Sequence, residues 1–251
     1  MKYTLVFSLT FILQACYVLS ACTLHPEVTE GPYYVAGMPV RGDITEDKTG
    51  LPLILNLRVV DSTTCSAYAG NATVEIWHCD AAGVYSHYEA ASKNQGTATD
   101  TKTYLRGIQY TNSSAYVTFN TIFPGWYTSR DTHIHLKVHI NGKNVHTGQL
   151  FFNDTLEASI AKIAPYSSNT NQVTLQSNDN VYKSGGSYGM LYPSYISSTI
   201  SSGLTASLDL VVNPSSTSSS GSSPVTNASY RPSSNAFHTI FIMIVLAFLL
   251  M

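Results

Sequence analysis

Short runs of β-branched and aromatic residues, separated by turn-forming residues, constrain the fold of this chain most. Each run is four to eight residues long and is bounded by Gly, Pro, Asn or Asp, which is typical of β-strands. Tyrosine, a residue enriched in strands, accounts for 17 of the 251 residues. We therefore expect strands at residues 53–60, 73–78, 116–122, 133–140, 149–152 and 208–212.

One short helix is expected among these strands. Asp154 is a residue of the N-cap type, and apolar side chains recur at helical spacing from Leu156 to Ile163. Many short strands with little helix favour an all-β fold, a β-sandwich with long irregular loops. The segments 86–115 and 164–206 have weak periodicity and are long for idle loops, so we expect them to shape a site.

The apolar N-terminus is interpreted as a processing signal rather than as core. Lys2 precedes an apolar run at 5–13, and small residues lead to Ala21. This order is typical of a secretory signal peptide over residues 1–21, which is too short to span a membrane. A bacterial lipoprotein cleavage box ending at Cys22 is the alternative. Either interpretation predicts export.

The C-terminus carries a second signal. Residues 214–227 are almost all Ser, Thr and Pro, which is the composition of a stalk. A small-residue triplet begins at Asn227, and a polar spacer leads to an apolar end at 240–251. This pattern predicts GPI attachment at Asn227 and a propeptide over 228–251. A tail anchor or an inserted hairpin is the alternative to that prediction.

One globular domain, residues 22–213, is expected between the two signals. We predict that it is secreted and held at the outer cell surface, with membrane contact only through the lipid anchor. The formal net charge of −2 provides no basic field, so a nucleic-acid partner is excluded.

Three cysteines lie in the expected mature chain. Cys65 and Cys79 flank a short segment with a turn and are expected to form a disulfide in an oxidising compartment. Cys22 is then the odd cysteine, either free or paired between chains. Sequons predict glycosylation at Asn71, Asn112 and Asn153, and a fourth sequon lies at Asn227.

Candidate chemistry concentrates around the strand 133–140. His133 and His135 point to the same side of a strand, and imidazoles one pleat apart can share one metal ion. No Glu follows the pair as a cupin requires, and a zinc hydrolase would have Asp131 as the only local base. Tyr127 lies six residues upstream of His133. Its phenolate is a hard anionic donor that suits Fe(III).

Four blocks of sequence resemble the intradiol ring-cleavage dioxygenases, and more closely their extracellular branch in fungi and arthropods. The blocks are TEGPYY at 29–34, IWHCDAxGxYS at 76–86, YLRGIQ at 104–109 and FxTIFPGWYxxRxxHIH at 119–135. The resemblance covers about residues 22–183.

This resemblance implies a non-haem Fe(III) enzyme on a β-sandwich that uses O2 to open catechol-type rings to cis,cis-muconate-type dicarboxylates. Arg130 would stabilise charge during oxygen attack, Gln149 would lie near the substrate, and Tyr33 would border the pocket. The implied iron ligands are Tyr85, Tyr127, His133 and His135.

The chain departs from the family pattern at two places, Ser129 and the segment 110–116, and both changes would reshape the mouth of the pocket. Two other functions stay open. One is a metal-free β-sandwich binding module displayed at the surface. The other is a zinc hydrolase using His133, His135 and Asp131.

Overall fold

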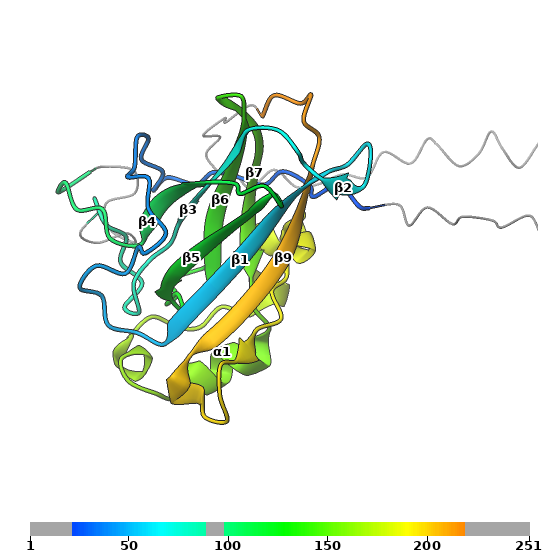
Figure 1. The fold of residues 1–251 in the computed structure, drawn as a ribbon. Coiled ribbons are helices and arrows are strands. Elements are labelled where there is room, and N and C mark those ends of the chain that lie inside the picture. The colour runs from blue at the N-terminus through cyan, green and yellow to red at the C-terminus, as the bar shows by residue number, and fades with distance from the viewer. Residues whose placement is uncertain (1–21, 89–97, 219–251) are drawn as a thin grey trace, which may run out of the picture. The chain divides into compact units, whose positions relative to one another are not determined.

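The computed structural model describes residues 22–88 and 98–218. These residues belong to one compact unit built from two β-sheets (Figure 1). The expected signal peptide, Asn227 and the propeptide lie outside the described residues. No helix within the described ranges is long and apolar enough to cross a membrane.

The first sheet is centred on β1 (Pro52–Asp61). β5 (Tyr116–Ile122) pairs with β1 antiparallel, and β9 (Leu204–Val212) pairs with it parallel. Two short strands complete the sheet. β2 (Ser66–Ala67) pairs with the end of β1, and β8 (Ser194–Tyr195) pairs with β9.

The second sheet carries most of the candidate chemistry. Its order is β4 (Arg106–Tyr110), β3 (Ala72–Trp77), β6 (His133–Ile140) and β7 (Lys143–Phe151), and all neighbours are antiparallel. The register places His135 between Trp77 on β3 and Gln149 on β7.

The core lies between the two sheets, as alternation along the strands requires. Ile134, Leu136 and Val138 of β6 belong to the main core cluster together with Leu55 and Leu57 of β1. The expected β-sandwich is therefore confirmed. Because the even-numbered side chains of β6 fill this core, the odd-numbered side chains face outward from the sandwich.

Within residues 22–88 and 98–218, helical structure consists of short pieces. α1 (Asp154–Ile160) is the expected helix, but its N-cap is Asn153, whose Oδ1 accepts a hydrogen bond from the Leu156 amide. A second helix, α2 (Asn180–Lys183), is capped by Asp179. Four 3-10 turns complete the set, at Tyr166–Ser168, Gln176–Asn178, Gly186–Gly189 and Ile200–Ser202.

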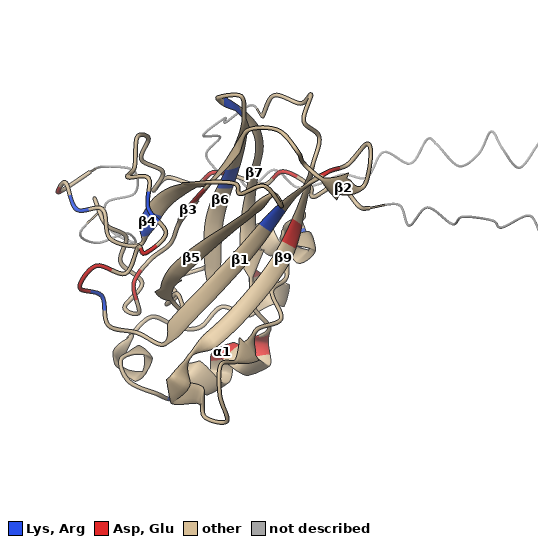
Figure 2. Ribbon diagram, viewed as in Figure 1, with Lys and Arg blue, Asp and Glu red and all other residues tan. Residues whose placement is uncertain are grey.

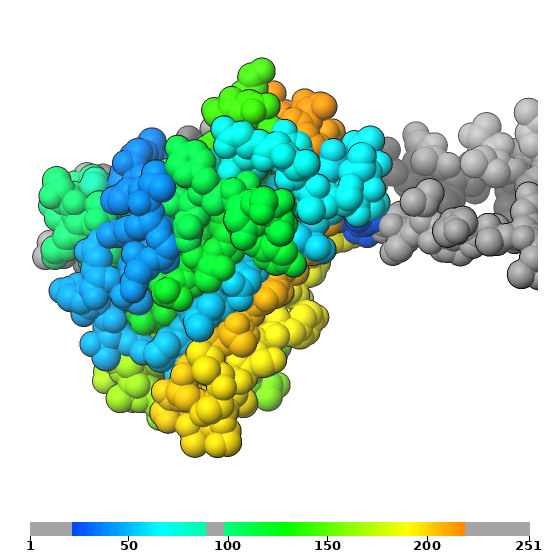
Figure 3. All heavy atoms as spheres, viewed as in Figure 1, coloured from blue at the N-terminus to red at the C-terminus, as the bar shows by residue number. Residues whose placement is uncertain are grey.

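The segment before β1 covers one edge of the second sheet. Arg41 donates its backbone N–H to the carbonyl of Ile108 on β4, and the Ile108 amide donates to Pro39. This segment forms part of the molecular surface (blue in Figure 3). Charged residues are sparse along the described part of the ribbon (Figure 2). The edge of β4 is thus covered rather than left unpaired.

The disulfide differs from the expected one. Cys65 pairs with Cys22, with 5.5 Å between their Cα atoms, whereas Cys79 is a buried free thiol. Cys65 lies in the exposed turn after β1, in the first sheet, but Cys79 follows β3 in the second sheet. The two cysteines flank a segment that passes from one sheet to the other, so they do not close a local loop.

Candidate metal centre

Two imidazoles of β6 form the base of the site. His133 and His135 project from the outer face of the second sheet, yet both side chains are buried. The N-terminal segment covers them, because a Cβ placed on Gly31 would lie 3.1 Å from Cε1 of His135. Trp77 stacks on the His135 ring at 4.9 Å between centroids.

Three donor atoms converge on one point beside these rings. Nε2 of His133 lies 3.1 Å from Nε2 of His135. Oη of Tyr85 lies 3.3 Å from the first nitrogen and 3.1 Å from the second. Ligands about 2.1 Å from one ion and at right angles to each other are about 3.0 Å apart. The spacing of the three donors therefore fits a shared metal ion.

Two turns that contain glycine pack closely against each other and bring Tyr85 beside Tyr127. Gly83 has φ +84°, and a Cβ there would lie 2.3 Å from the carbonyl oxygen of Trp126. A Cβ on Gly125 would lie 2.5 Å from the carbonyl oxygens of Asp80 and Ala81. Only glycine permits this close approach of the two backbones.

Tyr127 completes the set of four. Its ring centroid lies 5.8 Å from that of Tyr85 and 5.7 Å from that of His133. Nη1 of Arg130 donates a hydrogen bond to Oη of Tyr127 over 3.4 Å. The structure thus brings together all four residues that the sequence predicted as ligands.

Both histidines are neutral bases near pH 7. Burial, and next the positive charge of Arg130, lower the pKa of His133 to about 3. Burial also lowers the pKa of His135, and His133 adds to the decrease. Nδ1 of His133 lies 2.6 Å from the Asp131 carbonyl oxygen and donates to it, which leaves the Nε2 lone pair for a metal.

Both tyrosines are neutral phenols unless a metal ion binds beside them. Burial raises the pKa of Tyr85 well above its usual value and also raises the pKa of Tyr127. A bound ion of high charge reverses this balance, because it stabilises the phenolate directly. Two neutral imidazoles and two ionisable phenols therefore fit Fe(III), a hard and highly charged ion.

Arg130 belongs to a polar network at the edge of this cluster. Its Nε donates to Oδ2 of Asp179 over 2.8 Å, and its Nη2 donates to Oε1 of Gln149. The Gln149 amide donates in turn to the Thr29 carbonyl over 2.9 Å. Residues Arg130 and Gln149, both predicted from the sequence, are thus hydrogen-bonded to each other.

Asp179 is a site residue that sequence analysis missed. Besides accepting from Arg130, it accepts from the Asp131 amide and caps α2. The only sequence signal was its place in the segment 164–206, which was expected to shape a site without any residue being specified.

Tyr33 lies over the cluster. Its ring stacks on Tyr85 at 4.6 Å between centroids and meets Tyr127 edge-on at 5.9 Å. Tyr33 itself is buried. These buried aromatic rings lower the local dielectric constant beside the donor atoms, which strengthens electrostatic interactions there.

Asp131 does not lie beside the two imidazoles, where a zinc hydrolase would need it as a base. Its carboxylate lies with those of Asp154 and Glu157, all within 4.8 Å of one another, rather than beside the imidazoles as a base. Burial raises the pKa of Asp131 and of Glu157. The zinc arrangement therefore finds no support in the geometry.

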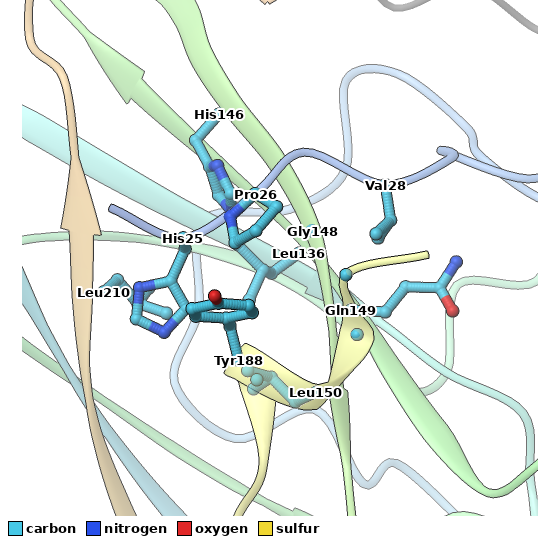
Figure 4. Close-up of a pocket in the computed structure, with 13 residues that line it drawn as sticks. His25, Pro26, Val28, Leu136, His146, Gly148, Gln149, Leu150, Tyr188 and Leu210 are labelled. Carbon is cyan, nitrogen blue, oxygen red and sulfur yellow. The ribbon is translucent and has the colours of Figure 1, made fainter. Parts of the chain in front are cut away.

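A small cavity behind Gln149 is distinct from this site. It measures about 10 Å³ and is lined by residues that include His25, His146 and Tyr188. The Gln149 amide points away from these histidines (Figure 4). A space of this size holds about one water molecule, so it does not bind substrate.

The predicted glycosylation sites occupy different surroundings. Asn71 and Asn112 are exposed, and Asn153 is partly buried as the cap of α1. Glycosylation at all three stays a prediction.

The protein is thus a β-sandwich with a mixed donor site. Two tyrosine phenols and two histidine imidazoles gather there at one sheet. A family model described as a dioxygenase matches residues 29–181, more than half of the chain. The chain is also 34% identical to an intradiol ring-cleavage dioxygenase from Tetranychus urticae, with a TM-score of 0.72. That match covers 78% of this chain and 98% of the other. The chain belongs to the intradiol ring-cleavage dioxygenases, a family of oxidoreductases.

Two further matches concern a shorter stretch of sequence and the fold. Catechol 1,2-dioxygenase from Acinetobacter baylyi is 33% identical over 107 residues, which is 41% of this chain. The match spans 32% of that relative's length, about a third. The dioxygenase domain of a carbohydrate-binding fusion from Streptomyces shares 23% identity, with a TM-score of 0.55 over 76% of this chain and 99% of the other, and shows the fold alone.

Proposed function

We propose that this protein is a non-haem Fe(III) dioxygenase that opens catechol-type rings between the two hydroxylated carbons. The reaction adds both atoms of O2 to the ring and yields a cis,cis-muconate-type dicarboxylate, so no external reductant is needed. The observation that carries the proposal is the convergence of Tyr85, His133 and His135 at donor spacings of 3.1 to 3.3 Å, beside Tyr127.

Iron would be held by Tyr85, Tyr127, His133 and His135. When bound there, Fe(III) supplies a Lewis-acid site for the catechol oxygens and the electronic coupling by which O2 reacts with the ring. The donor set supports this choice of metal, since two phenols and two neutral imidazoles match a hard cation of high charge.

The chain's own residues would bind and orient the substrate and would transfer protons. Oη of Tyr127, next to Arg130, is placed to take a proton from a substrate hydroxyl. Arg130 is permanently cationic and would stabilise negative charge that develops on the ring. Its bonds to Asp179 and Gln149 fix the direction of the guanidinium before substrate arrives. Tyr33 would close the pocket over the ring.

Export would place this reaction outside the cytoplasm. We infer a secreted chain with signal peptide 1–21, a domain over 22–213, a stalk and a GPI anchor at Asn227. The disulfide between Cys22 and Cys65 supports export, because such bonds persist in oxidising compartments. The sequence signals at both ends carry the rest of this inference.

Oxygen uptake with catechol tests the proposed activity. Iron-loaded wild-type protein should consume one O2 per ring opened and form a muconate-type product. Tyr127→Phe should lower kcat by at least about 100-fold, since it removes the proton-accepting oxygen. The matched control is Tyr68→Phe, which changes a partly exposed tyrosine just after β2 of the first sheet and should leave kcat unchanged.

Two results would contradict the proposal. Full turnover by Tyr127→Phe would refute the role of that phenol. Wild-type protein that binds iron at none of these residues and consumes no O2 would favour the metal-free binding module instead.

A further inference from the structure

A second cluster of polar side chains contains Asp131, which lies two residues before the candidate ligand His133. Asp131 precedes β6, and Asp154 and Glu157 lie on α1, which follows β7. One carboxylate oxygen from each of the three lies within 4.8 Å of the others. Asp131 and Glu157 are both buried, with 0% and 1% of their surface exposed.

Several oxygens of this cluster have no hydrogen-bond partner. Both carboxylate oxygens of Glu157 and Oδ2 of Asp131 are buried and unpartnered. A buried polar atom without a partner is costly, and more so if it is charged. Three such carboxylate oxygens on two residues that lie close together indicate a missing partner.

Among the residues that the structure describes, no basic side chain pairs with the three carboxylates. The nearest guanidinium in sequence, Arg130, is already paired with Asp179. The missing partner must therefore be positively charged and must bind several carboxylate oxygens at once.

We propose that Asp131, Asp154 and Glu157 bind a divalent cation of the calcium class, separate from the iron site. Ca²⁺ takes six to eight oxygen ligands at about 2.3 to 2.6 Å, so oxygens across its shell lie up to about 5 Å apart. The observed limit of 4.8 Å falls within that span. The free oxygens of Glu157 and Asp131 would be the first ligands, and Asp154 and water would complete the shell.

The position of this site suggests what the cation does. It would join α1 to the loop whose Asp131 carbonyl accepts the Nδ1 proton of His133. Holding that carbonyl fixes the imidazole with Nε2 toward the other donors. The cation would thus stabilise the fold next to the iron without contacting substrate.

Calcium binding to the full, iron-loaded protein tests the proposal. After removal of free divalent ions, calorimetric titration with CaCl2 should show one saturable site per chain, and metal analysis should find one calcium beside the iron. Calcium should also raise the Tm. Glu157→Gln, which keeps the size of the side chain, should weaken binding by at least about tenfold.

Asp154→Asn provides a second variant that is expected to fold. Asn retains an oxygen that can accept the hydrogen bond from the Gln176 amide, which Oδ1 of Asp154 accepts now. It should weaken calcium binding as Glu157→Gln does. Asp47→Asn removes an exposed acid elsewhere and should bind calcium as wild type does.

The outcomes separate this site from the iron site. Calcium binding lost in both cluster variants, with iron content unchanged, supports the proposal whether or not the protein turns over catechol. Wild type with no saturable calcium site, or variants that bind as tightly as wild type, would overturn it. The buried carboxyls would then be sharing a proton.

Discussion

Arg130 shows how much of this site depends on a single side chain. Its guanidinium contacts Tyr127, Gln149 and Asp179 through three different nitrogens. A planar group with fixed donor directions makes these three bonds at once, whereas a lysine ammonium is a point charge on a flexible stem. Charge alone is therefore not enough to replace it.

We expect Arg130→Lys to lower kcat by about 100-fold, the cost of losing a placed donor to developing charge. Iron binding should persist, because Arg130 is not among the four ligands. Steady-state kinetics with metal analysis on the same sample measures both. A Lys variant with wild-type kcat would contradict this account, because it would show that the positive charge is sufficient without the planar fork of donors.

His78 links the stability of the fold to pH. Its two ring nitrogens lie 2.8 Å from the Cys79 carbonyl and 2.7 Å from the Thr121 hydroxyl, and the side chain is buried. Burial lowers its pKa to about 4 from 6.5. Because the unfolded chain binds the proton more tightly, stability falls as pH drops below about 6.5 and levels off near 4.

Between pH 7 and pH 5 this one group should remove about 2 kcal/mol from the free energy of unfolding. Denaturant titrations at the two pH values measure the decline. The variant His78→Gln should show a decline smaller by about that amount, while His87→Gln, at a partly exposed position, should decline as wild type does. An equal decline in wild type and His78→Gln would show that His78 is not the group responsible.

The residues of the candidate site were largely predictable, because a motif of fixed spacing specifies them. Tyr85, Tyr127, His133 and His135 were all expected as ligands, and the structure gathers them. Asp179 was not predictable, since it reaches Arg130 from 49 residues along the chain. Nothing local in the sequence around an aspartate indicates a partner that only the fold brings near.

At the scale of elements, runs of β-branched and aromatic residues predicted the central strands better than the later ones. β5 and β6 begin and end at the expected residues, and β1 and β3 differ by a residue at each end. β7 and β9 begin six and four residues before the expected positions. β4 was missed because Arg106 and Gly107 interrupt the apolar pattern that marks a strand. Arg106 is nevertheless buried, since its guanidinium donates to the side chain and carbonyl of Ser86.

The disulfide was predicted wrongly because the pairing depends on the fold and not on nearness in sequence. Nearness in sequence favoured Cys65 with Cys79, but these two cysteines follow strands of different sheets. The partner of Cys65 is Cys22, 43 residues away, at the start of the segment that crosses the second sheet. Long-range pairing of this type cannot be read from cysteine spacing.

Removing this disulfide should destabilise the fold. Closing a loop of 43 residues is worth about 4 kcal/mol in the chain-entropy estimate. The double variant Cys22→Ser with Cys65→Ser should therefore lose up to about that much, measured by denaturant unfolding. Reductant should destabilise wild type and leave the double variant unchanged. A peptide map that joins Cys65 to Cys79 would contradict the pairing.

At the scale of the whole molecule, residues just beyond 213, the expected end of the domain, make hydrogen bonds to β7. Ser216 donates its hydroxyl to the Val145 carbonyl, and the Ser218 amide donates to Asn144. Residues up to 218 thus pack on β7. The Ser-rich composition of 214–227 predicted a stalk and gave no indication of this contact. The domain boundary itself stays a prediction.

Chains cut after residue 218 test both the boundary and the anchor. A chain that ends there should appear in the culture medium as active enzyme, while the full chain should stay at the cell surface until a phosphatidylinositol-specific phospholipase releases it. A chain ending at 213 should be secreted but less stable by about 1 kcal/mol for each hydrogen bond lost. Full-length protein found free in the medium without phospholipase would contradict the GPI prediction.

The visible absorption spectrum of the purified protein tests the central claim most directly. The account predicts a broad tyrosinate-to-Fe(III) charge-transfer band in the iron-loaded protein, reddish to the eye, that shifts when catechol is added. Such a shift would report the metal, the tyrosine ligands and substrate binding in one sample. A protein that stays colourless after iron reconstitution would contradict the dioxygenase function.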